Sequence, residues 1–197
     1  GGVRGGGGGG GGQLDLSRYM NGIGPVDPEA RTVEVEPGVV LDELNAHLAA
    51  YGLQFAPDVA TSSRATIGGM IANNSCGAHS IVYGRTVDHV VELTTALADG
   101  RVVTFPSREN DGSAKLFETE LGRIRDNNFE DIERRFPKVL RSNGGYGLDR
   151  LGPPGTPADA LKILCGSEGT LGIVVRAKLR LVPIPRCTGL VVLHFDS

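Results

Sequence analysis

One stretch near the end of the chain alternates strictly between apolar and polar residues, and this limits the folds open to it. Apolar residues occupy the odd positions from Leu171 to Leu181, and Arg176, Lys178 and Arg180 stand between them. A period of two places successive side chains on opposite faces, so the pattern predicts a strand that is buried on one face. With short helices and hairpins elsewhere, it favours an α+β fold over a regular βαβ series.

Further elements are predicted from spacing along the chain. Residues 32–36 alternate as a short strand, and the leucines of 41–48 recur at helical spacing. The apolar runs 87–97 and 101–105 are joined by an Asp-Gly pair at 99–100 and predict a hairpin. We also expect a polar loop over 55–64, turns at 73–77 and 166–170, a strand over 188–195, and helices near 66–72, 113–125, 128–135 and 158–165.

Composition and charge argue against several classes of protein. The 197 residues suit one domain of ordinary size, and 40% hydrophobic residues can form a core. The net charge of −3 and the lack of a long basic run argue against a general nucleic-acid binder. No apolar stretch reaches the roughly 18 residues of a membrane-spanning helix. We therefore expect neither a transmembrane segment nor a signal peptide.

Cysteine and histidine give no metal framework. Cys76, Cys165 and Cys187 are far apart, which fits a reducing compartment. The four histidines lack metal-ligand spacing, and we interpret each as structural or solvated. This interpretation is weakest for the one histidine that lies in a glycine-rich stretch, His79.

Eight consecutive glycines, Gly5 to Gly12, follow Arg4 near the start of the chain. Exposed backbone amides beside a cation suit a phosphate, because amides donate hydrogen bonds and no Cβ blocks the approach. A doubly wound dinucleotide fold would need a strand before the glycines and a helix after them, and a P-loop would need Gly-Lys-Ser/Thr. A flexible linker is the alternative interpretation, and the run alone does not decide between them.

Two later stretches are also candidate ligand sites. The polar, glycine-rich segment from Pro57 to Gly84 can lie against a flat ligand and donate backbone N–H groups to it. Within it, the N-terminus of the helix expected after Thr66 favours an anion. The segment 166–173, GSEGTLGI, predicts close packing of the backbone on a ligand or on another strand. Ordinary loops with helix caps are the alternative for both.

Four motifs in this order resemble the FAD-binding domain of the vanillyl-alcohol oxidase / p-cresol methylhydroxylase superfamily. They are RGGG at 4–7, PDVATSSRATIGGMIANNSCGAHSIVYGRT at 57–86, LADGRVV at 97–103 and GSEGTLGIV at 166–174. They are most similar to the D-lactate, glycolate and D-2-hydroxyglutarate dehydrogenase branch. The segment FPKVLRSNGGYGLDRL at 136–151 resembles a longer subgroup, in which the flavin part is fused to a C-terminal iron–sulfur part.

The resemblance implies FAD as the cofactor and an FAD-binding domain of the p-cresol methylhydroxylase type over residues 1–186. This domain would have two α/β subdomains, the first truncated at its N-terminus, and residues 187–197 would begin a C-terminal substrate or cap domain. The implied cofactor-binding residues are Arg4, Gly5, Gly6, Gly7, Gly8, Gly9, Gln13, Pro57, Asp58, Thr66, Ile67, Gly68, Gly69, Asn73, Ser75, Cys76, Gly77, Ser80, Gly84, Glu168, Gly169, Gly172 and Ile173.

The first motif departs from the family pattern. Gly8 to Gly11 stand where the family loop has Thr, Ser, Leu and a small residue. The departure removes two hydroxyl donors from the expected diphosphate cradle, so we expect weaker FAD binding. Some relatives attach flavin covalently through histidine or cysteine; we predict no such link here, and His79 and Cys76 are the positions at which to test for one.

The resemblance implies a dehydrogenase that transfers a hydride from C2 of a D-2-hydroxy acid to flavin N5 and forms the 2-oxo acid. The acid would be of the lactate, glycolate or 2-hydroxyglutarate type. Catalytic residues are expected in the cap domain, and an iron–sulfur domain or a quinone-linked carrier would accept the electrons. We expect a cytoplasmic location, with peripheral attachment to the inner membrane as the alternative. Two other functions stay open: an FAD-linked alcohol or sugar oxidase that uses oxygen, and a flavin-binding module without turnover.

Overall fold

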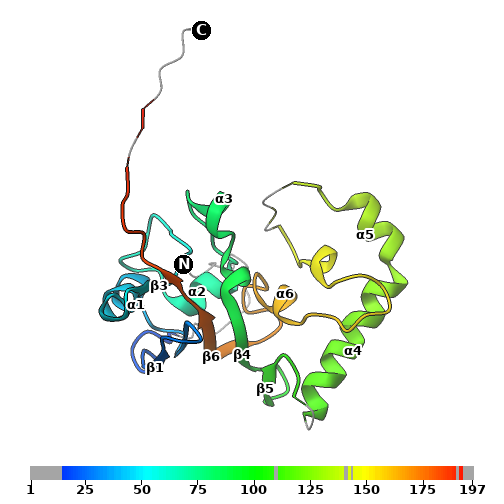
Figure 1. Cartoon of the computed structure of the whole chain (residues 1–197). Coiled ribbons are helices and arrows are strands. Elements are labelled where there is room, and N and C mark those ends of the chain that lie inside the picture. The colour runs from blue at the N-terminus through cyan, green and yellow to red at the C-terminus, as the bar shows by residue number, and fades with distance from the viewer. Residues whose placement is uncertain (1–14, 109–110, 140–141, 143, 190, 193–197) are drawn as a thin grey trace, which may run out of the picture.

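The computed structural model describes residues 15–108, 111–139, 142, 144–189 and 191–192. Its main sheet has five strands in the order β1-β2-β6-β4-β5, and all neighbours are antiparallel (Figure 1). Their bounds are β1 Ile23–Asp27, β2 Thr32–Val35, β6 Ile173–Arg180, β4 Val90–Ala96 and β5 Val102–Phe105. A two-stranded sheet pairs β3 (Leu53–Gln54) with β7 (Val182–Pro183). The prediction of α+β over a parallel βαβ series is confirmed.

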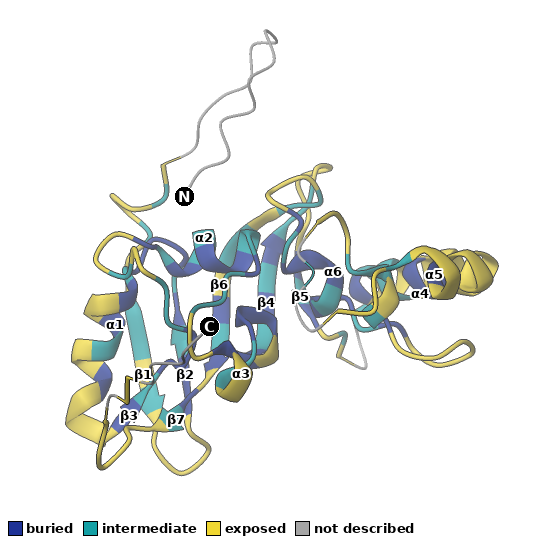
Figure 2. Ribbon diagram, turned by 90° about the horizontal axis from the view of Figure 1, so that it is seen from above, coloured by how far each residue is buried: buried dark blue, intermediate teal, exposed yellow. Residues whose placement is uncertain are grey.

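The described residues form six α-helices and three short 3₁₀ helices, and α4 and α5 lie to one side of the sheet (Figure 2). The α-helices are α1 Leu41–Leu48, α2 Ile67–Ala72, α3 Ser80–Tyr83, α4 Gly112–Asn127, α5 Phe129–Arg135 and α6 Leu161–Leu164. The 3₁₀ helices are η1 Ala49–Tyr51, η2 Thr86–His89 and η3 Leu148–Arg150. Helix α1 confirms the leucine pattern, because Leu41, Leu44 and Leu48 are buried against the sheet while its outer face is exposed (Figure 2).

The central strand is β6, and it is buried on one face along only part of its length. Ala177, Leu179 and the following Leu181 are buried, as predicted. At the other end the prediction is wrong, because the strand begins at Ile173, whose side chain is 43% exposed. The register between β4 and β6 shifts at Thr94/Thr95, and this end of the strand borders a cavity rather than the core.

Three other expected elements differ from the structure. Strand β4 begins at Val90, because residues 86–89 form η2, and the helix expected over 158–165 is shortened to α6. The strand expected over 188–195 is wrong for residues 188, 189, 191 and 192, which pair with no strand in the described part of the chain. The remaining positions of that segment lie outside the described residues.

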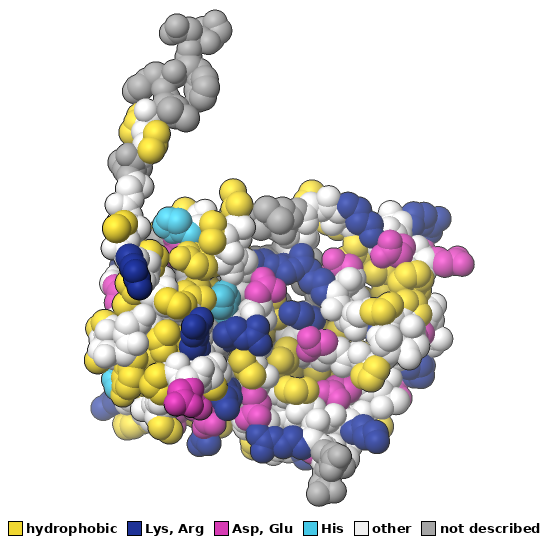
Figure 3. Space-filling model, viewed as in Figure 1, with side chains coloured by type: hydrophobic (Ala, Val, Ile, Leu, Met, Phe, Trp, Pro, Cys, Tyr) yellow, Lys and Arg dark blue, Asp and Glu magenta, His cyan; other side chains and the backbone are white. Residues whose placement is uncertain are grey.

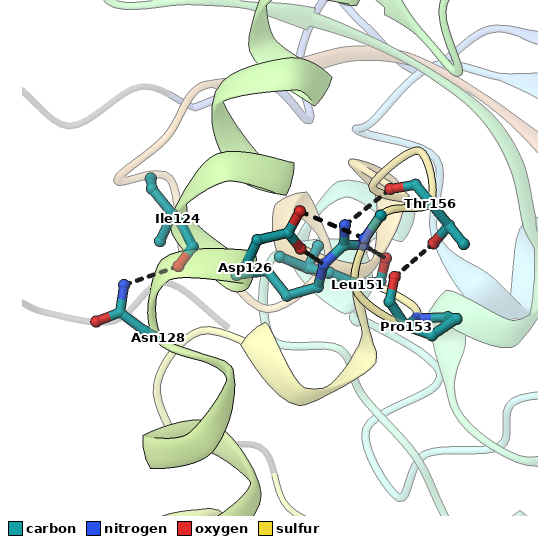
Figure 4. Close-up of polar contacts among 8 residues, drawn as sticks. Ile124, Asp126, Asn128, Leu151, Pro153 and Thr156 are labelled. Atoms are coloured by element: carbon teal, nitrogen blue, oxygen red, sulfur yellow. Dashed lines mark hydrogen bonds and ion pairs between the residues drawn. The ribbon is translucent and has the colours of Figure 1, made fainter.

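Within the segment between β5 and α6, a buried arginine joins the end of the segment to α4. Arg125 of α4 is 2% exposed, and its guanidinium donates to the carbonyls of Leu151 at 3.0 Å and Thr156 at 2.8 Å. It also donates to Asp126 at 2.7 Å, and the contacts fix the loop 151–156 on α4 (Figure 4). Each of the three guanidinium nitrogens of this buried cation thus donates to an oxygen, which lowers the cost of burying the charge.

Candidate functional site

A cavity of about 630 Å³ opens where α2, the start of β6 and the middle of β4 come together. Its volume lies within the range of small-molecule and cofactor sites. Its walls are mixed, with apolar side chains beside hydroxyl, amide and backbone groups. Eight of the residues expected to bind the cofactor line it: Thr66, Gly68, Gly69, Asn73, Glu168, Gly169, Gly172 and Ile173.

Two segments about a hundred residues apart in the sequence form adjoining parts of the cavity wall. The backbone N–H of Gly166 donates to the carbonyl of Ile71 at 2.9 Å, and that of Glu168 donates to Ala72 at 3.0 Å. The turn at 166–170 therefore sits on the C-terminal end of α2. This pairing brings together the second and third candidate stretches of the sequence.

The start of α2 has no free amide for an anion, so that part of the sequence interpretation is wrong. The N–H of Ile67 donates to Val39 O and that of Gly68 to Pro37 O, each at 2.8 Å. The N–H of Gly69 donates to Oγ1 of Thr66 at 3.2 Å, as in an ordinary N-cap. Thr66 and Gly69 still line the cavity, but the first-turn N–H groups are already satisfied.

The glycine at the start of β6 is required by packing against a strand. A Cβ at Gly172 would lie 2.4 Å from Cγ2 of Thr95 and 2.9 Å from the carbonyl of Ala96. Of the two interpretations given for this stretch, close packing on another strand therefore explains Gly172. Gly169 differs, because a Cβ there would meet nothing within 4 Å and its φ is +81°.

One wall of the cavity carries a buried polar atom without a partner. Thr95 is 1% exposed and lines the cavity, and its Oγ1 has no hydrogen-bond partner among the described residues. A buried hydroxyl in this state costs free energy unless a ligand or water supplies the partner. Among the described lining residues Arg64 is the one cation, and Asp15 and Glu168 are the carboxylates, so the cavity offers both charged and apolar contacts to a ligand.

A second group of expected site residues gathers next to α3. A Cβ at Gly77 would lie 1.5 Å from the carbonyl oxygen of Asp58, so only glycine allows these two segments to touch. The carboxylate of Asp58 then accepts the backbone N–H of His79 at 3.3 Å and contacts its Nδ1 at 2.6 Å. Ser80 follows, and its buried Oγ also lacks a partner within the part of the chain that the structure describes.

The other expected residues do not line the cavity. Ile67 is fully buried in the core and Pro57 is buried as well. The carbonyl of Ser75 accepts two bonds from Thr86, Cys76 is half-buried, and Gly84 ends α3. The candidates of the first motif, Arg4, Gly5 to Gly9 and Gln13, lie outside the described residues.

Sequence reasoning missed several residues that line the cavity. Ser63 and Arg64 lie inside the 57–84 stretch, and the cation there was an available signal for an anion site. The sequence does not mark Thr95 as a site residue, because threonine is common in strands. Its role follows only from the register shift of β4 against β6.

A much smaller hollow of about 20 Å³ is lined by Arg85, Arg150 and Lys162, among others. Nζ of Lys162 lies 3.8 Å from Asp88, and Nε of Arg150 lies 3.6 Å from Asp149. On the face of the molecule that Figure 3 shows, Lys and Arg side chains lie interspersed with Asp and Glu. At about 20 Å³ this hollow has room for little more than one water molecule, so it is a weaker candidate for a ligand site than the main cavity.

The described residues hold no group of three His, Cys, Asp or Glu side chains suited to a metal ion. None of their helices has the length and apolar character needed to cross a bilayer. Burial raises the pKa of the Cys165 thiol to about 12, so this cysteine stays protonated at neutral pH.

Known proteins similar to this chain include dehydrogenases and an oxidase subunit. It is 41% identical over 195 residues to D-2-hydroxyglutarate dehydrogenase of Pseudomonas putida, covering 93% of this chain and 19% of that protein. The Escherichia coli protein of the same name is 37% identical, with the same coverage. Glycolate oxidase subunit GlcD of Bacillus subtilis is 33% identical over 170 residues, covering 86% of this chain and 27% of that protein. The chain thus spans about a fifth of the length of the first two relatives.

The fold is also found among solved structures. Alkyldihydroxyacetonephosphate synthase matches with a TM-score of 0.57 and 22% identity, covering 88% of this chain and 25% of that one. The family described as FAD binding domain matches residues 2–106, more than half of the chain. That range contains the first three motifs and the Thr66–Asn73 wall of the cavity. The chain therefore belongs to the family of FAD-binding domains.

Proposed function

We propose that this chain is the FAD-binding part of a dehydrogenase that oxidises a D-2-hydroxy acid to the 2-oxo acid. The observation that carries the proposal is the 41% identity, over 93% of the chain, to a D-2-hydroxyglutarate dehydrogenase. The cavity supports it, because its volume and its mixed apolar and polar walls suit a cofactor that has polar groups and flat rings.

In this proposal the chain binds and orients the cofactor. Arg64, Ser63 and Thr66 offer a charge and hydroxyls to the diphosphate, and Thr95 offers its unpartnered Oγ1. Leu93, Leu164, Ile173 and Val174 provide an apolar wall for a ring and exclude water from it. When bound, FAD accepts the hydride that leaves C2 of the hydroxy acid.

We assign catalysis, substrate binding and electron transfer to other parts of the protein. We propose that residues 1–186 form an FAD-binding domain of two subdomains, the first continuing upstream, and that residues 187–197 begin the substrate domain. The catalytic base and the carboxylate-binding cations would lie there. The electron acceptor would be an iron–sulfur domain or a quinone-linked carrier, and the location cytoplasmic or peripheral on the inner membrane.

The first experiment is a titration of the purified chain with FAD, followed by its visible absorbance. We expect flavin bands that stay with the protein on gel filtration and are released as free FAD on denaturation. Bands that remain with the denatured protein would mean a covalent link, to be mapped at His79 and Cys76. No binding at excess FAD would contradict the proposal.

A second experiment separates the dehydrogenase from its rivals. Anaerobic addition of D-2-hydroxyglutarate, D-lactate or glycolate to the FAD-loaded full-length protein, which would include the proposed substrate domain, tests reduction, with the L-enantiomers of the chiral acids as matched controls. Bleaching by a D-acid followed by slow reoxidation in air supports the dehydrogenase. Fast reoxidation favours an oxidase, and binding without bleaching leaves a flavin-binding module.

A further inference from the structure

A chain of hydroxyl groups links the segment 144–147 to the turn that walls the cavity. The hydroxyl of Tyr146 lies 2.8 Å from Oγ1 of Thr170, and this Oγ1 donates to the carbonyl of Ser167 at 2.5 Å. A threonine hydroxyl has one hydrogen. Because Thr170 uses that hydrogen on Ser167, Tyr146 must be the donor in its own bond to Thr170.

The turn that receives this bond has an unfavourable backbone. Glu168 has a φ of +52° and Gly169 a φ of +81°, so two consecutive residues are left-handed. For Glu168 this conformation costs free energy, because its Cβ crowds the backbone there. Ser167, Glu168 and Gly169 all line the cavity, so its wall has the right shape only while contacts outside the turn hold it.

Tyr146 is itself anchored next to that turn. The N–H of Leu148 donates to the carbonyl of Tyr146 at 2.9 Å, which ties it to the start of η3. A Cβ at Gly147 would lie 3.0 Å from the carbonyl of Lys162, so this loop packs on the backbone of α6. Helix α6 leads directly into Ser167. Tyr146 is therefore held by contacts with η3 and α6, which lie outside the Ser167–Thr170 turn.

We propose that Tyr146 is a positioning residue that holds the Ser167–Thr170 turn in its cofactor-binding shape. The inference rests on the proposed function, which makes this turn a wall of the FAD site. It assigns a role in cofactor binding to the segment 107–157, which lies outside the range matched by the FAD-binding family. Neither Tyr146 nor Thr170 is among the residues expected from the sequence to bind FAD.

The test removes only the hydroxyl. Tyr146→Phe is expected to bind FAD about 2- to 10-fold more weakly, the range for a single hydrogen bond. Tyr51→Phe, an exposed tyrosine on η1, is the matched control and is expected to bind like the wild type. Thr170→Val, which also removes the bond to Ser167, is expected to lose at least as much affinity as Tyr146→Phe, and Thr170→Ser, which keeps the hydroxyl, to retain most of the affinity.

The pair of sites is tested by a double-mutant cycle. If Tyr146 acts through Thr170, the double variant Tyr146→Phe/Thr170→Val loses little more affinity than Thr170→Val alone. Additive losses, or wild-type affinity in Tyr146→Phe, would overturn the inference. Thermal unfolding of each cofactor-free variant shows whether the effect on binding is a loss of folded protein.

A readout without cofactor separates this inference from the proposed function. Amide hydrogen exchange at Glu168 and Thr170 reports on the turn in the cofactor-free chain, and we expect faster exchange in Tyr146→Phe than in Tyr51→Phe. Unchanged exchange overturns the inference whether or not FAD binds. Faster exchange in a chain that takes up no FAD would refute the proposed function and keep Tyr146 as the residue that orders the turn.

Discussion

Nδ1 of His79 lies 2.6 Å from Oδ2 of Asp58, and Oδ1 of the same carboxylate accepts the backbone N–H of His79. The carboxylate thus fixes both the ring and the main chain at the start of α3. The pair is largely open to solvent, with the His79 side chain 70% exposed. A paired Nδ1 leaves Nε2 as the ring nitrogen that faces outward.

This pair depends on the close approach of Asp58 and Gly77, which gives the first prediction. Gly77→Ala is expected to lower the free energy of unfolding by about 1–3 kcal/mol or more, because a Cβ would sit on the Asp58 carbonyl and move the backbone. Urea unfolding measures the change. The control is Gly112→Ala at the first residue of α4, where an added Cβ would meet nothing within 4 Å. This variant is expected to raise the free energy of unfolding by up to about 1 kcal/mol.

Thr95→Val is expected to shift stability and cofactor binding in opposite directions. Loss of the unpartnered hydroxyl should raise the stability of the cofactor-free chain by about 1 kcal/mol, because a buried orphan group is removed. FAD should bind about 2- to 10-fold more weakly if Oγ1 is its partner. Calorimetry with and without FAD measures both. A variant that is more stable and binds FAD as well as the wild type would show that the hydroxyl faces no ligand.

Arg64→Gln is expected to weaken FAD binding about 3- to 10-fold and to flatten its dependence on salt. Arg64 is the cation on the described cavity wall, and its attraction for a diphosphate is screened as ionic strength rises. Titrations at low and high salt give the measurement. Arg123→Gln on the exposed face of α4 is the charge-matched control, and equal losses in both variants would argue against a specific contact.

The Arg125–Asp126 contact predicts a contribution to acid sensitivity. The hydrogen bond from Arg125 lowers the pKa of the Asp126 carboxyl below its ordinary value. The folded chain thus prefers the charged form, so this contact stabilises it at pH values above the unfolded pKa, about 3.9. The contribution is lost as the pH falls through the lowered folded pKa.

Asp126→Asn should therefore be less stable than the wild type near neutral pH and lose less stability on acidification. Urea unfolding across the acidic range measures this, with the exposed Asp42→Asn as the control. Parallel stability curves for Asp126→Asn and the wild type would count against the contact.

The cysteines should differ sharply in reactivity. The thiol of Cys165 is buried and its pKa is raised to about 12, so it should resist a thiol reagent at mildly alkaline pH. Cys187 is exposed and should react at once. Mass spectrometry of the labelled peptides, with Cys187→Ser as the control, measures both. Fast labelling of Cys165 in the folded chain would mean that α6 opens readily.

The elements that could be predicted are those set by local spacing. The leucines of α1, the Asp-Gly hairpin between β4 and β5, and the alternation that ends in Leu179 each reflect one face of one element. The exposed Ile173 could not be predicted, because its surroundings depend on a register shift against another strand.

In the candidate site, too, the features set by local sequence could be predicted and those set by tertiary contacts could not. Glycine-rich stretches marked two walls of the cavity, Thr66–Asn73 and Glu168–Ile173. Thr95 stayed hidden because only tertiary pairing makes its hydroxyl an orphan. The expected anion site at α2 was wrong for a related reason, since the carbonyls of Pro37 and Val39, from a distant loop, already accept its first N–H groups.

The central place of β6 has a consequence for synthesis. The strand lies between β2 and β4 in the sheet, yet it is the last of the five to be translated. Until it leaves the ribosome, β2 and β4 each present an unpaired edge, and such edges invite aggregation. The Ser167–Thr170 turn and the start of β6 both line the cavity, and they are synthesised after the other four strands. The cavity can therefore first bind a ligand only late in translation.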